Sequence, residues 1–148
     1  MLDVSSQLNS LYHEVIKKHN KEPYHFEKVP AATLSLRANN PICGDRFDLF
    51  IDADKDMLDA LHFHGFGCAI SKASSSIMIQ TLEGKSYEEA INICSNFLAY
   101  IHNELDGEVY SVDFEAFEAL QTQTARLDCA ALSWKTMLEF LKQKTKQQ

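Results

Sequence analysis

The sequence contains no long apolar run and no excess of positive charge. No segment approaches the ~18 consecutive apolar residues of a membrane-spanning helix, and the first ten residues hold no basic stretch followed by an apolar one. The 14 basic and 21 acidic side chains give a formal net charge of −7, which favours neither nucleic acid nor an anionic membrane as a partner. We therefore expect a single-domain cytoplasmic protein with no secretory signal.

Cysteine is scarce, and no two of the four cysteines form a CxxC pair. Without a signal peptide, four cysteines indicate reduced or metal-bound thiols rather than a disulfide framework. Cys43, Cys68 and Cys129 lie in a Pro/Gly turn or at predicted helix starts, where free N–H groups and the helix dipole favour a thiolate. Gly44 permits a turn that directs Cys43 and Asp45 toward one centre. Three thiolates and a carboxylate suit a four-coordinate ion such as zinc, with Zn–S near ~2.3 Å.

Other patterns favour structural explanations. Cysteine is often a buried space filler, which is the alternative for all three thiols and the preferred interpretation of Cys94, on the apolar stripe of a helix. His62 and His64 share one face of a strand, where a solvated or hydrogen-bonded pair is favoured over a metal site. The acidic segment 52–56 lacks the glycine and glutamate of a calcium loop and is expected to be a turn. Residues 74–76 are serines without a nucleophile elbow, which argues against a hydrolase.

Hydrophobic periodicity predicts an α+β fold with two layers, in which a small antiparallel sheet of about three strands packs against several helices. The predicted helices start with an apolar stripe from Leu8 to Ile16 and continue with Cys68–Leu82, a helix capped by Ser86, a short helix capped by Asp113 and a last helix beginning near Cys129. The predicted strands cover Ala32–Asn39, the alternating segment Arg46–Asp52 and Leu58–His64, the last two forming a hairpin. We expect one domain over residues 1–148, with frayed ends at 1–6 and 143–148.

Three blocks of sequence carry a family resemblance. Asn40–Arg46 (NPICGDR), Gly65–Met78 (GFGCAISKASSSIM) and Ala125–Lys135 (ARLDCAALSWK) resemble the U-type iron–sulfur cluster assembly proteins, which include the NifU-like domains. The first two blocks are similar to both IscU scaffolds and SufU proteins. The third is closer to SufU, because Arg126 stands three residues before the last cysteine and no histidine directly precedes it. The match runs from about Leu8 to Leu141.

The resemblance implies a zinc-dependent sulfurtransferase, a sulfur carrier in iron–sulfur cluster assembly. Its metal ligands correspond to Cys43, Asp45, Cys68 and Cys129. Cys43 corresponds to the cysteine that accepts a persulfide from a PLP-dependent cysteine desulfurase of the SufS type, before the sulfur passes to a downstream cluster scaffold. Arg126 corresponds to an arginine associated with ligand exchange when the partner docks. No nucleic acid and no membrane is implied.

Two alternatives stay open at the sequence level. In the first alternative, the chain is a scaffold that assembles a transient iron–sulfur cluster on the same four ligands. In the second, zinc only stabilises the fold and the protein is an interaction module. Two departures from the SufU pattern also stand out. Asp128 occupies a position that is basic in SufU proteins, where it caps the last helix or affects Cys129 through its charge, and segment 21–36 matches the family poorly.

Overall fold

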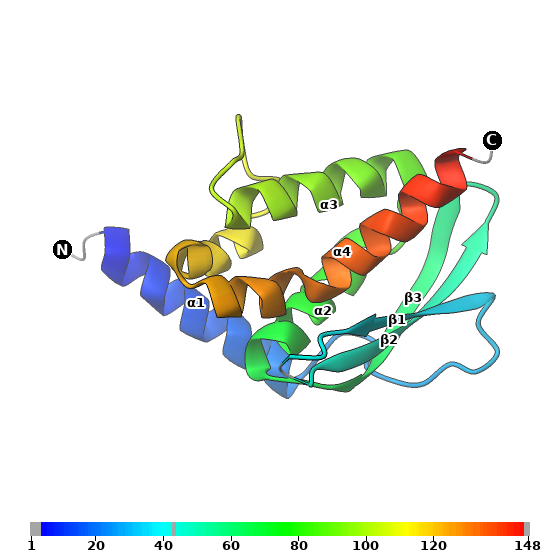
Figure 1. Ribbon diagram of the computed structural model, residues 1–148, viewed down its shortest axis with the longest axis horizontal. Helices are drawn as coiled ribbons and strands as arrows, with labels where there is room; N and C mark the ends of the chain where they lie inside the picture. Colours follow the sequence, from blue (N-terminus) through cyan, green and yellow to red (C-terminus); the bar gives the residue numbers. More distant parts are fainter. Residues whose placement is uncertain (1–3, 43, 147–148) are drawn as a thin grey trace.

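A three-stranded antiparallel sheet and a layer of helices build the molecule. The structure is a computed structural model that describes residues 4–42 and 44–146 (Figure 1). Its elements, in chain order, are α1 (Val4–Lys21), β1 (Leu34–Asn39), β2 (Arg46–Asp54), β3 (Met57–Phe66), α2 (Ala69–Leu82), α3 (Tyr87–Ile101), the 3₁₀ helix η1 (Val112–Thr122) and α4 (Thr124–Lys146). The predicted α+β class is confirmed, because the sheet forms one layer and the helices the other.

The sheet has the strand order β1-β2-β3, with both pairs antiparallel. The alternation in β2 buries Phe47, Leu49 and Ile51 completely, as predicted. β3 is three residues longer than predicted: it begins at Met57 instead of Leu58 and ends at Phe66 instead of His64. Gly65 allows this extension, because a Cβ atom at this position would lie 2.2 Å from the carbonyl oxygen of Arg46 on the neighbouring strand.

Side chains cap the starts of α2 and α3, and the cap of α3 was predicted. The side chain of Cys68 caps α2 and accepts a hydrogen bond from the backbone N–H of Ser71. Ser86 and Glu89 form the predicted capping box at the start of α3, since Ser86 Oγ accepts from Glu89 N–H (3.1 Å) and Glu89 Oε1 accepts from Ser86 N–H (3.4 Å). Each cap satisfies N–H groups that have no partner within the helix.

Three predicted boundaries are wrong. α4 begins at Thr124 rather than near Cys129, because the N–H groups of Arg126 and Leu127 already bond to the carbonyl of Gln123, both at 3.0 Å. The short helix before it is capped by Ser111, not Asp113: Ser111 Oγ accepts from the N–H of Asp113 at 3.2 Å. β1 begins at Leu34 rather than at Ala32, and the fraying expected at the chain ends stays a prediction.

The hydrophobic core lies between the sheet and the helices, and α2 contacts α1, α4 and β3. Fully buried aromatic residues join α3, η1 and α4 there, and the rings of Phe97 and Trp134 stack with centroids 4.2 Å apart. Cys94 belongs to this core with no exposed surface, and burial raises the pKa of its thiol. The predicted core role of Cys94 is therefore confirmed.

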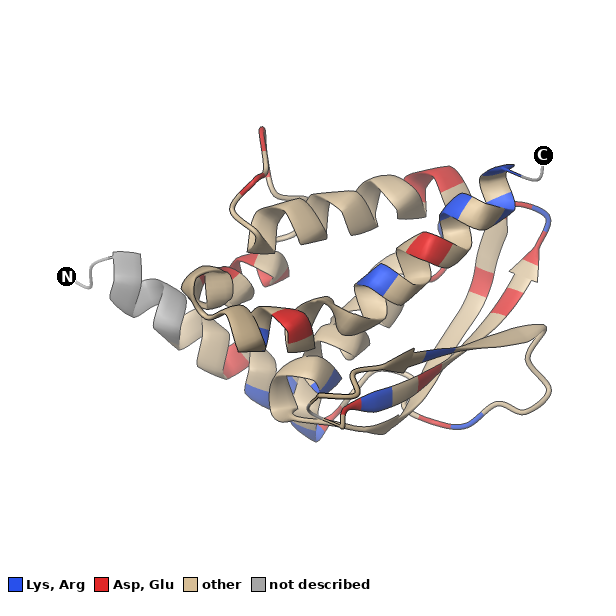
Figure 2. Cartoon of the chain, in the orientation of Figure 1, with Lys and Arg blue, Asp and Glu red and all other residues tan. Residues whose placement is uncertain are grey.

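Residues of both charges are spread along the helices and strands (Figure 2). Basic side chains occur in the last turns of α1 and α4, where the negative end of each helix dipole favours cations (Figure 2). Among the described residues, none of the helices is both long and apolar enough to cross a membrane.

Candidate metal centre

The loop between β1 and β2 places Asp45 at one end of the sheet. Gly44 has a φ of +79°, a conformation that favours glycine, and its N–H bonds to the carbonyl of Asn40 at 2.8 Å. The N–H of Asn40 bonds in turn to the carbonyl of Asp45 at 2.9 Å. These two bonds close the turn and hold the Asp45 side chain inward, with 5% of the residue exposed.

The start of α2 supplies the second group. Cys68 is exposed, and its sulfur lies 3.5 Å from the N–H nitrogen of Ser71 and 3.6 Å from the Ser71 hydroxyl oxygen. Gly67 makes the close packing possible, since a Cβ there would lie 2.6 Å from Ser71 Oγ and 2.9 Å from the ring of Phe47. The N-terminus of α2 therefore presents hydrogen-bond donors to the Cys68 sulfur.

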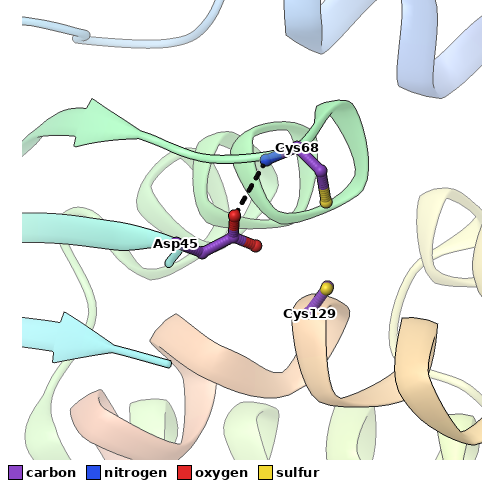
Figure 3. A group of neighbouring side chains, drawn as sticks. All are labelled: Asp45, Cys68 and Cys129. Atoms are coloured by element: carbon purple, nitrogen blue, oxygen red, sulfur yellow. Dashed lines mark hydrogen bonds between the residues drawn. The ribbon is translucent and has the colours of Figure 1, made fainter. Parts of the chain in front are cut away.

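α4 supplies the third group. Cys129 is half-buried in the second turn of α4, so the prediction that it stands at a helix start is wrong. Its sulfur and that of Cys68 point toward one another across the gap between α2 and α4 (Figure 3). Packing of the two helices, rather than the dipole of α4, brings Cys129 to the site.

The three side chains converge on one point. Possible ligand atoms of Asp45, Cys68 and Cys129 all lie within 4.8 Å of one another, and no other such group of three exists within residues 4–42 and 44–146. Asp45 Oδ1 accepts a hydrogen bond from the N–H of Cys68 at 3.1 Å (Figure 3). Asp45 Oδ2 is buried without a hydrogen-bond partner among the described residues. A buried carboxylate oxygen without a donor is unfavourable unless a cation neutralises it, so the group fits a metal ion.

The donor set also limits the kind of ion. Two soft sulfurs beside one harder carboxylate oxygen suit zinc or iron better than calcium or magnesium, which prefer oxygen ligands alone. A fourth donor would complete a tetrahedral zinc site. Cys43, the predicted fourth ligand and persulfide acceptor, lies outside the described residues.

Arg126 and the two strand histidines are not members of this group of possible ligands. Arg126 is exposed in the first turn of α4, one helical turn before Cys129, and forms no ion pair within the described part of the chain. His62 pairs with Glu27 at 3.3 Å and stacks on His25, with ring centroids 4.7 Å apart. His64 stacks on Phe26. Neither histidine belongs to a group of possible metal ligands among the described residues, and the contact of His62 with Glu27 agrees with a solvated or hydrogen-bonded pair for that residue.

The sequence analysis did not identify the buried serine side chains of α2 as part of the surroundings of the site. Ser71 contacts Cys68, and Ser74, Ser75 and Ser76 are each at most 1% exposed. The available signal was a row of hydroxyls on a predicted buried helix, because buried hydroxyls need hydrogen-bond partners. The sequence pattern alone does not show which residues those partners are.

The fold and the Asp/Cys group together define a class of protein: a U-type domain with a candidate metal centre at the end of its sheet. The sequence model of the protein family described as the NifU-like N-terminal domain matches residues 11–147. The chain belongs to this family of iron–sulfur cluster assembly proteins, within the SufU/IscU group.

Similar proteins bear both names used in this group. The chain is 35% identical over 137 residues to the zinc-dependent sulfurtransferase SufU of Bacillus subtilis, covering 92% of each chain. It is 34% identical over 140 residues to the iron–sulfur cluster assembly scaffold protein IscU of Streptococcus pyogenes, covering 93% of this chain and 86% of that one. A crystal structure of a putative SUF-system scaffold protein from Fervidobacterium islandicum has a TM-score of 0.80 at 29% identity and covers 87% of this chain and 95% of that one.

Proposed function

We propose that this protein is a zinc-dependent sulfur carrier, which accepts sulfur on Cys43 from a cysteine desulfurase and passes it to a cluster scaffold. The observation that carries the proposal is the convergence of Asp45, Cys68 and Cys129 around the unpartnered Oδ2 atom. The name of the Bacillus relative supports zinc and sulfur transfer. A relay of thiols also needs a reducing compartment, which in bacteria is the cytoplasm.

Zinc would be held by Asp45, Cys68 and Cys129, with Cys43 as the fourth ligand. Bound zinc keeps thiolates ionised near neutral pH without undergoing a redox change of its own. The chain's own contribution is the arrangement of the donors: Asp45 is fixed by the N–H of Cys68, and Cys68 by Ser71. The donors are therefore positioned before the ion arrives.

Sulfur transfer needs no external oxidant. The Cys43 thiolate attacks the terminal sulfur of the desulfurase persulfide, a new sulfur–sulfur bond forms on Cys43, and the partner's cysteine leaves as a thiolate. The second transfer repeats the exchange with the scaffold as acceptor. For this step Cys43 must be accessible to the persulfide of the desulfurase.

Arg126 and Asp128 flank the last ligand on α4. In the proposal, the Arg126 guanidinium moves toward the Asp45 carboxylate when the desulfurase docks and compensates its charge. Both side chains are exposed, so such a movement requires no repacking of the core. Asp128 lies within the first turns of α4, where its charge interacts favourably with the helix dipole.

The face around the centre is suited to a protein partner. Phe66 is 61% exposed, pairs with Arg46 across the sheet and has the Arg46 guanidinium 5.5 Å above its ring. Ile42 and Phe66 therefore offer apolar surface next to the two ligand loops. We assign this face to the PLP-dependent cysteine desulfurase.

The test is a transfer assay with zinc-loaded protein, a SufS-type desulfurase and cysteine. We expect faster alanine release and a gain of one sulfur atom in the mass of the peptide containing Cys43. Cys43→Ala should abolish both effects, while Cys94→Ala, the matched control in the core, should keep them. Unchanged alanine release and an unmodified Cys43 peptide would count against the carrier.

A scaffold function is the second candidate, because the Streptococcus relative carries the name of a scaffold and aligns over nearly the whole chain. Here the iron–sulfur cluster would be the cargo, held transiently by the same four ligands. Anaerobic incubation with ferrous iron, desulfurase and cysteine distinguishes the two functions. A cluster that this protein then transfers to an apo-ferredoxin would favour the scaffold, and persulfide without cluster would favour the carrier.

A further inference from the structure

A buried serine joins the helices that carry the two cysteine sulfurs. Ser74 on α2 is 1% exposed, and its hydroxyl donates to the carbonyl of Ala130 on α4 at 2.6 Å. The same hydroxyl oxygen accepts a hydrogen bond from Trp134 Nε1 at 2.9 Å. Ser74 thus forms two buried hydrogen bonds to two residues of one neighbouring helix.

The Ser74–Ala130 bond lies close to both cysteine residues in the sequence of their helices. Ala130 directly follows Cys129 in α4, and Ser74 belongs to the helix that Cys68 caps. The Ser74–Ala130 bond therefore connects the helix of one sulfur to the backbone beside the other. In a close-packed interior without water to replace it, such a bond resists sliding of α4 along α2.

We propose that Ser74 is a positioning residue of the metal centre. It holds α4 against α2 so that the sulfurs of Cys68 and Cys129 lie within reach of one ion. The inference rests on the proposed function, since the ion is zinc. Ser74 contacts neither sulfur and acts through the backbone at Ala130.

The same helix pair provides a matched control. Ser75 is equally buried, and its hydroxyl pairs with the Ser133 hydroxyl at 2.6 Å. This bond joins two side chains and does not involve the backbone beside Cys129. Ser75→Ala therefore removes a buried hydroxyl between α2 and α4 without releasing the backbone at Ala130.

A variant of Trp134 distinguishes an effect on the stability of the fold from an effect on the position of the sulfurs. Trp134→Phe removes the Nε1 donor and opens space in the core but leaves the Ser74–Ala130 bond in place. The double variant Ser74→Ala/Trp134→Phe removes both partners of the indole bond, so that no donor stays buried without an acceptor. We expect the double variant to avoid the unpaired indole donor of the single Ser74→Ala variant, and it still lacks the bond to Ala130.

The experiment measures zinc affinity by competition with a chromogenic chelator, the Co²⁺ absorption spectrum, and the urea stability of each metal-free protein. Ser74→Ala and the double variant should bind zinc about tenfold or more weakly, with altered thiolate–Co²⁺ bands. Ser75→Ala and Trp134→Phe should stay within about twofold of the wild-type affinity, even where their stability falls.

Two results would overturn the positioning role. One is a Ser74→Ala or double variant with wild-type zinc affinity and an unchanged Co²⁺ spectrum. The other is an equal loss of affinity in Ser74→Ala and Ser75→Ala, which would reflect general loosening of the helix pair. A wild-type protein that binds no zinc would instead refute the proposed function itself, and the inference with it.

Discussion

Asp45 buries a carboxylate with one oxygen hydrogen-bonded to the N–H of Cys68 and the other without a partner. In a protein without bound metal this arrangement is unfavourable, because desolvation of the charge is only partly compensated. The same arrangement favours a cation. Asp45 therefore lowers the stability of the metal-free protein and raises its affinity for a metal ion.

Asp45→Asn tests this balance. The amide oxygen still accepts from the N–H of Cys68, but the charge is lost, so we expect zinc affinity to fall about tenfold or more. The free energy of unfolding of the metal-free protein should stay the same or rise, because a buried charge has been removed. Chelator competition and urea titration measure the two quantities. Unchanged zinc affinity would mean that Asp45 is not a ligand.

Cys94→Ala tests the separation of the core thiol from the site. Cys94 has no exposed surface, and burial raises the pKa of its thiol, so it stays protonated and unreactive. We expect a loss of about 1 kcal/mol of stability in urea titration. Native wild-type protein treated with iodoacetamide should remain unlabelled at Cys94. Labelling there at a rate similar to Cys68 would contradict the buried assignment.

At single positions, sequence and structure contribute different information. The Cys-Gly-Asp turn and the glycine pair before Cys68 identify Asp45 and Cys68 as ligand candidates, because their local backbone is encoded locally. The roles of Ser71 and Ser74 depend on contacts with residues that only packing brings near, Ala130 being 56 residues from Ser74. Sequence patterns of short range therefore identify the ligand candidates and miss the buried serines of α2.

Among the elements, the start of α2 depends on a close contact at Gly67. A methyl group there would press on Ser71 Oγ and on the buried ring of Phe47. Gly67→Ala should therefore destabilise the fold and weaken zinc binding, because Cys68 is displaced. Gly84→Ala is the control, because nothing lies within 4 Å of the added Cβ. The backbone φ of +83° at Gly84 is unfavourable for alanine, so this variant should also lose about 1 kcal/mol of stability.

The measurements are urea unfolding and chelator competition on both glycine variants. Both variants should lose stability, but Gly84→Ala should bind zinc as the wild type does. Equal zinc affinity in both would show that the packing at Gly67 does not position Cys68.

The contact between α1 and α2 predicts a pH dependence. His19 is buried with Nδ1 2.8 Å from Ser76 Oγ, which also accepts a hydrogen bond from the N–H of Tyr24. Burial lowers the pKa of His19 from 6.5, outweighing the nearby charge of Asp113. The unfolded chain then binds a proton at a higher pH than the folded chain, so stability is lost as the pH falls below about 6.5.

His19→Gln should flatten the pH profile of the unfolding free energy in this range, as followed by urea titration at several pH values. A variant profile with the wild-type slope would show that His19 is not the group responsible.

The elements also show where sequence patterns mislead. The hairpin and the capping box are local, and both were predicted correctly. The start of α4 was placed too late, since Asp128 next to Cys129 resembles a cap while residues 124–128 carry little apolar periodicity. Packing of η1 against α4 and the bonds to the Gln123 carbonyl decide the true start.

For the whole molecule, the metal centre lies where the sheet end, α2 and α4 meet. Each element contributes one possible ligand, and the three are far apart in the sequence. Metal binding therefore joins parts of the fold that no single segment holds together, and bound zinc should stabilise the native state by mass action. The exposed side chains of Ile42 and Phe66 beside the centre leave it open to a partner.

The most direct measurement is zinc-edge X-ray absorption on protein purified without chelators. We predict one zinc per chain with three sulfur neighbours near ~2.3 Å and one oxygen neighbour near ~2.1 Å, supplied by Cys43, Cys68, Cys129 and Asp45. A shell made of nitrogen and oxygen alone, or a protein that contains iron in place of zinc, would contradict the proposed zinc-dependent carrier.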